Sequence, residues 1–173
     1  TSVLTVAILC CPLTSVMALA AQTLRVDYYH FGNASQESFG VDRVVVEPLP
    51  WPGHPRKVID ETNMGKYLFE VRDRTSNRLV YSRGFASIYG EWETTEEART
   101  RQRVFSESLR FPAPEAPVQI VLKKRDAQNT FREVWSTIVD PKDMFVDTAT
   151  PANPGALIEI QRSGDSAEKV DFL

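Results

Sequence analysis

The sequence of 173 residues is poor in the side chains that carry thiol or metal chemistry, with two cysteines and two histidines. Both cysteines, Cys10 and Cys11, lie in an apolar N-terminal stretch, so no thiol remains beyond residue 20. This excludes a disulfide framework and a cysteine nucleophile from the rest of the chain. The histidines His30 and His54 stand apart, and the H-E-x-x-H pattern of a zinc helix is absent from the sequence. We therefore expect no catalytic, cofactor-binding or metal-binding residue in this chain.

Charge is missing from the start of the sequence, where no charged residue precedes Arg25. Positions 3–21 read VLTVAILCCPLTSVMALAA and end in Ala18-Leu19-Ala20, the small-x-small pattern of a signal-peptidase site. We interpret residues 1–20 as a secretory signal peptide whose basic n-region is missing from the sequence. A membrane anchor is the alternative, because the run is nearly long enough to span a bilayer. Pro12 and the small-residue end favour the signal, so we expect a secreted or periplasmic protein without membrane contact after cleavage.

A large excess of either charge is also missing, since the sequence contains 20 Lys and Arg and 23 Asp and Glu. The basic groups at 99–103 and 123–125 are small and have acidic neighbours, so we expect no nucleic-acid partner. The sequence contains neither a Gly-rich phosphate loop nor G-x-S-x-G. Nucleotide chemistry and serine-hydrolase chemistry are therefore not indicated.

What the sequence does contain is a series of short apolar–polar alternations separated by turn residues. These alternations predict strands near 24–30, 41–47, 67–71, 79–81, 105–111, 118–122, 131–139 and 157–160. Seven or more short strands with turns between them are typical of an all-β fold, a two-sheet antiparallel sandwich that is Ig-like in the loose sense. Asn77 is expected at a left-handed turn position, and the prolines of 48–55 predict an extended loop outside any ladder.

Helical signals are confined to one region after the fourth expected strand. Thr94 and Glu97 have the spacing of a capping box, which predicts a short helix over about 95–101. Residues 87–92 contain Gly and aromatic side chains, and we expect them to be irregular or to form a short strand.

Two groups of acidic residues and one histidine each have a possible functional role as well as a structural one. Asp140, Asp143 and Asp147 could hold calcium, but their spacing departs from an EF-hand loop, and a turn cluster is favoured. The acids of 91–97 could supply a carboxylate pair for glycoside hydrolysis, but a solvated face is favoured. His30 falls within a strand alternation, which favours a packed histidine over a metal ligand.

The aromatic residues are the remaining candidates for a binding surface. Trp135 alternates with core-type residues, which indicates a place in the core. Trp51 lies among prolines and Trp92 among acids, so both are candidates for an interdomain or ligand contact. A free-standing extracellular module that binds glycans or proteins through such aromatics is one hypothesis for the function.

Long stretches of the sequence resemble one known family. They are TLRVDYYHFGNAS, DRVVVEPLPWPG, GKYLFEVRDR, LVYSRGFASIYGEWETTEEA, FSESLRFPAPEAPVQIVLKKRDAQNTFREVWSTIVDP and EIQRSGDSAEKVDFL. From about Thr23 to Leu173 the chain resembles the N-terminal domain of the bacterial IgA-peptidase family of secreted zinc metallopeptidases.

This resemblance implies a non-catalytic β-sandwich over 23–147, followed by a linker and the start of a truncated catalytic domain over 148–173. The zinc site is implied to lie downstream, in a C-terminal protease domain that is missing from the chain and would be its partner. A protein substrate is implied through that domain. The family's zinc helix has no counterpart at any position here, so no catalytic or metal residue is carried over.

Overall fold

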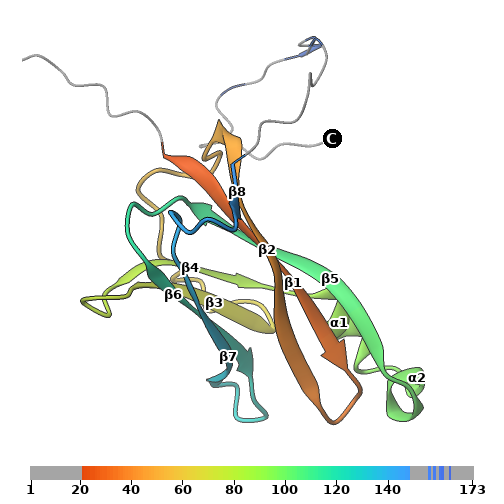
Figure 1. The fold of residues 1–173 in the computed structure, drawn as a ribbon. Coiled ribbons are helices and arrows are strands. Elements are labelled where there is room, and N and C mark those ends of the chain that lie inside the picture. Colours follow the sequence, from red (N-terminus) through yellow and green to blue (C-terminus); the bar gives the residue numbers. More distant parts are fainter. Residues whose placement is uncertain (1–20, 149–155, 157, 159, 162–163, 165–173) are drawn as a thin grey trace, which may run out of the picture.

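The computed structural model describes residues 21–148 and, beyond them, Ala156, Ile158, Ile160, Gln161 and Gly164. Within these residues the chain forms strands and two short helices (Figure 1). In chain order they are β1 (Gln22–Gly32), β2 (Glu37–Pro50), β3 (Tyr67–Asp73), β4 (Leu79–Phe85), α1 (Ile88–Trp92), α2 (Glu96–Thr100), β5 (Arg103–Pro112), β6 (Val118–Arg125), β7 (Phe131–Val139) and β8 (Val146–Asp147). The expected signal peptide and most of 148–173 lie outside the described residues, and those predictions stay untested.

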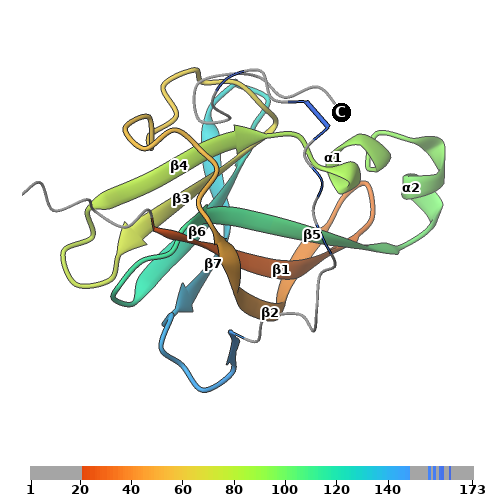
Figure 2. The ribbon, with the colours of Figure 1, turned by 90° about the horizontal axis from the view of Figure 1, so that it is seen from above.

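The strands form two sheets of four, with orders β5-β1-β2-β8 and β4-β3-β6-β7. All pairs are antiparallel except β2 with β8, which is parallel. Figure 2 shows the sheets as two layers, with α1 and α2 at the end where the chain crosses from β4 to β5. The predicted all-β two-sheet sandwich is confirmed.

The core lies between the two sheets and follows directly from the sequence alternation. Side chains at every second position of a strand point to the same face. The inward positions of β1, β3, β5 and β6 are mostly apolar. The buried side chains that meet there include Leu24, Val26, Tyr28, Phe69, Val71, Leu109, Phe111, Ile120 and Leu122. Trp135 is half-buried and packs against this core, as its alternation predicted.

The turns and helices agree with the sequence in part. Asn77 has φ 55°, so its predicted left-handed conformation is confirmed. The expected short helix is α2, but its N-cap is Thr95, whose side chain accepts from the Ala98 amide, and not Thr94. Helix α1 was missed, because Gly90 in its middle disfavours a helix. The Ser87 hydroxyl caps this helix by accepting a hydrogen bond from the Gly90 amide.

Two expectations about strand limits were wrong. Strand β2 continues through the first prolines of 48–55, because a bulge lets Pro50 pair with Gln22 at an edge of the ladder. No strand includes Ile158 or Ile160, whereas Leu157 and Glu159 lie outside the described residues. Among the residues described, no helix has the length and apolarity needed to cross a membrane.

Candidate functional site: a buried ionic cluster around His30

The imidazole of His30 is fully buried between the two sheets, at the end of the sandwich near α1. Its Nδ1 lies 3.2 Å from Oε2 of Glu107 on β5, and its Nε2 lies 3.1 Å from Oε2 of Glu37 on β2. The ring stacks on Tyr89 of α1, with centroids 3.8 Å apart and 19° between the planes. Phe39 lies on the ring as well, at a centroid distance of 4.3 Å. His30 of β1 is thus held by side chains from three other elements, β2, β5 and α1.

Tyrosines complete the coordination of the two carboxylates. The Tyr28 hydroxyl donates to Oε2 of Glu107 at 2.7 Å, and the Tyr67 hydroxyl donates to Oε2 of Glu37 at 2.9 Å. The backbone N–H of Tyr89 donates to the other oxygen of Glu107 at 3.3 Å. Each carboxylate therefore has several donors, which is what a buried charge needs in order to be tolerated.

Two lysines extend the cluster toward the surface. Lys124 on β6 places its Nζ 3.1 Å from Oε1 of Glu37 and 2.7 Å from Oε2 of Glu93. Lys66 places its Nζ 2.5 Å from Oε1 of Glu93 and donates to the carbonyl of Gly90 at 2.8 Å. We call the whole group the His30 cluster; its members are Tyr28, His30, Glu37, Lys66, Tyr67, Tyr89, Glu93, Glu107 and Lys124.

The hydrogen bonds determine the protonation of His30. An ionised carboxylate is only an acceptor, so a ring nitrogen that faces one must carry a proton. Both ring nitrogens of His30 face a carboxylate, namely Glu107 and Glu37. When both carboxylates are ionised, the imidazole is therefore an imidazolium, and with Lys66 and Lys124 it balances the charges of the three glutamates of the cluster.

The pKa shifts in the cluster have the corresponding directions. Burial by itself lowers the pKa of His30, but the hydrogen bonds and charges of Glu107 and Glu37 outweigh it and raise that pKa above 6.5. Burial also opposes ionisation of Glu37 and Glu107, yet the hydrogen bonds from His30 and its positive charge or that of Lys124 bring their pKa values below 4.5. Burial raises the pKa of Tyr89 to about 12.

This arrangement connects β1, β2, β5, β6 and α1 and offers little for chemistry. His30 is fully buried and both of its nitrogens are engaged, so it has no free atom with which to take a proton from a substrate. The two carboxylates bind opposite nitrogens and do not converge on a point. Among the described residues no group of three or more His, Cys, Asp or Glu side chains is placed to hold a metal ion.

The sequence does contain a signal for the cluster. In β5, Glu107 occupies the inward series of Phe105, Leu109 and Phe111, because it lies opposite Tyr28 in the register with β1. A charged residue at an apolar position of a strand needs a buried partner. His30, at the end of the inward series of β1, was read as a packed histidine, and that reading is confirmed, but its partners were missed.

The two tryptophans that the sequence marked as contact residues are both half-buried and packed within this domain. Trp51 lies edge-on to Tyr81, at 5.7 Å between centroids, and its indole N–H is buried without a partner among the described residues. Trp92 donates to Oε2 of Glu97 at 3.0 Å and packs against Phe105. Their contact with a further domain or a ligand stays a prediction.

The acidic groups marked by the sequence are used locally. Glu93, Glu96 and Glu97 form ion pairs with Lys66, Arg99 and Arg103, respectively. This arrangement differs from two carboxylates facing each other across an open cleft, so it does not favour a glycoside hydrolase.

The aspartates and the second histidine also have local hydrogen bonds. Asp140 and Asp143 accept backbone N–H groups of their own turns, from Lys142 and Phe145. Nδ1 of His54 accepts N–H groups within its loop. These contacts are those of turn residues, which the sequence favoured over a calcium site.

Comparison with known proteins identifies the family of this chain. The family model described as the peptidase M64 N-terminus matches residues 17–136. A search of curated proteins finds no match. The resemblance seen in the sequence also extended over 137–173, and that extension stays a prediction. Because the match covers more than half of the chain, the protein belongs to the family of peptidase M64 N-terminal domains.

Proposed function

We propose that this chain is the non-catalytic N-terminal accessory domain of a secreted zinc metallopeptidase of the IgA-peptidase family. The observation that carries the proposal is the family match over residues 17–136. The uncharged apolar segment before Arg25 supports export. Under this proposal the zinc ion and its ligands belong to a catalytic part encoded after Leu173, and the domain described here packs against that part.

An exposed apolar pair is well placed for such packing. Met144 and Phe145, in the loop between β7 and β8, are 86% and 84% exposed. The loop is held by the Lys142 amide donating to Oδ1 of Asp140 and the Phe145 amide donating to Oδ1 of Asp143, each at 2.9 Å. A fixed, exposed pair of large apolar side chains is typical of a protein contact.

The pair also lies close to the point where the chain leaves the sandwich. Phe145 is two residues before Asp147, which ends β8. A catalytic part joined through the following residues would be held at high effective concentration beside the loop. We therefore infer that Met144 and Phe145 contact that part.

Reading the gene beyond Leu173 is the first test. An H-E-x-x-H sequence within the next few hundred residues is expected, and a stop codon directly after Leu173 would contradict the proposal. The present chain, supplied with zinc and a general protein substrate such as casein, should show no cleavage. Cleavage abolished by a chelator would show that the catalytic residues lie in this chain after all.

The contact itself can be tested in the complete gene product. Phe145→Ser should expose the junction to limited proteolysis and lower the melting temperature of the catalytic part. Met64→Ser is the matched control, because Met64 is 70% exposed in a loop far along the chain, between β2 and β3. Equal behaviour of the two variants would exclude Phe145 from the interface without affecting the assignment to a peptidase.

A glycan-binding module is the second candidate, and one observation favours it. On the outer face of β1, Tyr29 and Phe31 are 40% and 38% exposed. The cross-strand neighbours of Tyr29 are Gly40 and Ser106, which are too small to cover its ring. Exposed aromatic rings bordered by small polar residues suit stacking on a sugar. Binding to a glycan array that is lost in Tyr29→Ala would support this function. Absence of binding to any glycan on the array would exclude it.

A further inference from the structure

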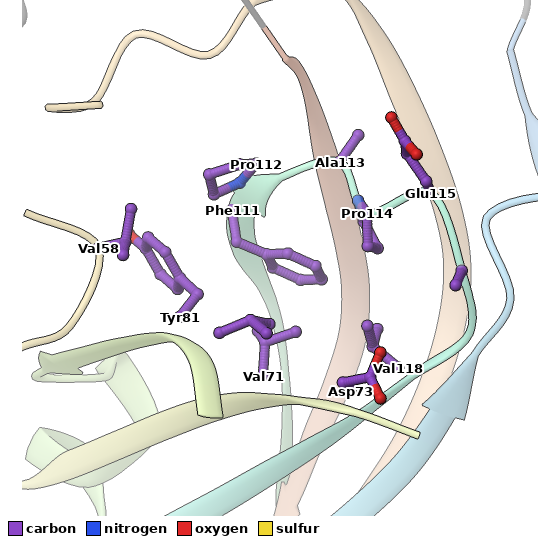
Figure 3. A pocket seen from close by; sticks show the side chains of 12 residues that line it. Val58, Val71, Asp73, Tyr81, Phe111, Pro112, Ala113, Pro114, Glu115 and Val118 are labelled. Atoms are coloured by element: carbon purple, nitrogen blue, oxygen red, sulfur yellow. The ribbon is translucent and has the colours of Figure 1, made fainter. Parts of the chain in front are cut away.

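An apolar hollow of about 360 Å³ opens at the end of the sandwich that lies opposite the His30 cluster, between the start of β4 and the end of β5. Its floor and walls come from Val71, Tyr81, Phe111 and Val118, with Val58 at one side (Figure 3). We call it the Phe111 hollow. Its volume is at the small end of the range of about 300–1,000 Å³ for small-molecule sites, so it has room for one aliphatic side chain and part of the backbone that carries it.

The rim of the Phe111 hollow is stiff. It is formed by the end of β5 and the loop to β6, in which Pro112, Pro114 and Pro117 fix the backbone dihedral φ. The Ala113 amide is tied to the carbonyl of Gln22 at 2.7 Å, and the carbonyl of Pro117 accepts from the Arg74 amide at 3.1 Å. A hollow with a rigid rim takes a ligand at little ordering cost.

The charge at the rim has one sign. Asp73 and Glu115 line the hollow, and none of the residues that line it is Lys, Arg or His. Asp73 is already used, because its Oδ1 accepts from the amide and hydroxyl of Ser76, each at 2.7 Å, and the positive charge of Arg78 acts on it. Glu115 is exposed, and no hydrogen bond or ion pair joins it to another described residue. Glu115 is therefore the carboxylate available to a ligand.

We propose that the Phe111 hollow binds an extended polypeptide segment. The segment places one aliphatic side chain in the hollow, over the rings of Phe111 and Tyr81, whose centroids lie 6.3 Å apart. It places the Lys or Arg that follows this side chain beside Glu115. Apolar contact supplies most of the affinity, and the exposed charge pair selects the sequence. This site does not depend on the peptidase assignment, because it is made wholly from residues of the sandwich.

Peptide titration of the present chain, followed through its backbone amide NMR signals, tests the site. Acetyl-Ala-Leu-Lys-Ala-amide should shift the amides of Ala113 and Val118. Replacing Leu by Ala in the peptide should weaken binding by about tenfold or more, because several buried methylene groups are lost. Replacing Lys by Glu should weaken it by about two- to fivefold, because an exposed ion pair becomes a repulsion.

Two variants with a matched control complete the test. Ala113→Leu should fill the hollow and abolish the shifts. Glu115→Gln should remove the preference for Lys over Glu in the peptide, whereas Glu133→Gln, an exposed change on β7, should leave it intact. If Ala113→Leu fails to fold, the comparison of Glu115→Gln with Glu133→Gln still decides.

Several results would overturn the proposal. Absence of shifts at several millimolar peptide would show that the hollow is only the unfilled end of the sandwich. Equal shifts with the Ala peptide would show that no side chain enters it. Equal affinity for the Lys and Glu peptides would exclude the role of Glu115.

Discussion

Nδ1 of His30 lies 3.2 Å from Oε2 of Glu107, although the two residues are 77 positions apart in the chain. The contact joins the neighbouring strands β1 and β5 on the inner face of their sheet, where both side chains are almost fully removed from water. A buried ion pair of this kind is costly to break from one side, because the remaining charge stays buried without its partner. Glu107→Gln and His30→Gln each remove one partner of this pair.

Glu107→Gln should be strongly destabilising. The amide keeps the shape of the carboxyl but leaves the imidazolium of His30 and the Tyr28 hydroxyl without the charge that they bind. We expect a loss of about 3 kcal/mol in the free energy of unfolding, measured by urea denaturation. Glu96→Gln, in an ion pair whose carboxylate side chain is 81% exposed, is the control and should leave the midpoint nearly unchanged. Equal midpoints for both variants would show that the buried pair contributes nothing.

The stability should depend on pH at both ends of a window. The folded-state pKa of His30 is raised above 6.5, so its contribution is complete below pH 6.5 and is lost as the pH rises through the folded value. The folded-state pKa values of Glu37 and Glu107 are lowered below 4.5, so their contribution is complete above pH 4.5 and is lost as the pH falls through the folded values. The cluster therefore stabilises most between about pH 4.5 and 6.5.

His30→Gln separates the two limits. The variant should flatten the decline in melting temperature on the alkaline side of this window, and His54→Gln should not. A wild-type curve with no decline above pH 6.5, or an unchanged slope in His30→Gln, would show that the imidazolium does not contribute. The ring nitrogens of His30 should both carry protons in ¹⁵N NMR spectra at pH 6, below the ordinary pKa of 6.5.

Gly32, at the end of β1, should not tolerate a side chain. Its φ is +146°, and an added Cβ would lie 2.0 Å from the carbonyl oxygen of Gln36 and 2.8 Å from the Tyr89 hydroxyl. Gly32→Ala should cost about 2 kcal/mol or more in the free energy of unfolding. Gly40→Ala is the matched control, because nothing lies within 4 Å of its added Cβ, and it should be neutral or slightly stabilising. Similar losses of stability in both variants would show that neither the positive φ nor the close contacts of Gly32 cause the loss.

Trp51→Phe and Trp92→Phe should differ. The indole N–H of Trp51 is buried without a partner among the described residues, so removing it relieves an unsatisfied donor. The indole N–H of Trp92 donates to Glu97, and its removal loses that bond. We expect the larger fall in melting temperature for Trp92→Phe. A larger fall for Trp51→Phe would mean that its packing against Tyr81 outweighs the unsatisfied group.

Much of the β architecture could be predicted because alternation is a local property. The inward series Leu24, Val26 and Tyr28 indicates both a strand and the face that it buries. Asn77 and Asn129 have positive φ at the turns of two hairpins, and such turns depend on nearest neighbours. The limit of β2 was wrong because a bulge lets the ladder reach Pro50. The cap of α2 was wrong because the capping hydroxyl belongs to Thr95, one residue after the expected Thr94. Hydrophobic periodicity specifies neither feature.

The amino-acid sequence by itself determined the strands, the sandwich and the absence of thiols beyond residue 20, since each follows from short-range pattern or composition. Only the tertiary structure decided the partners of His30 and the position of the Phe111 hollow. The carboxylates of Glu37 and Glu107 reach the two nitrogens of His30 because β2 and β5 flank β1 on either side in the sheet. The hollow lies where the start of β4 and the end of β5 meet the proline-rich loop that follows β5. The contact of His30 with Glu107 and the hollow both depend on the pairing of strands far apart in the chain, and local apolar–polar alternation does not specify which strands pair.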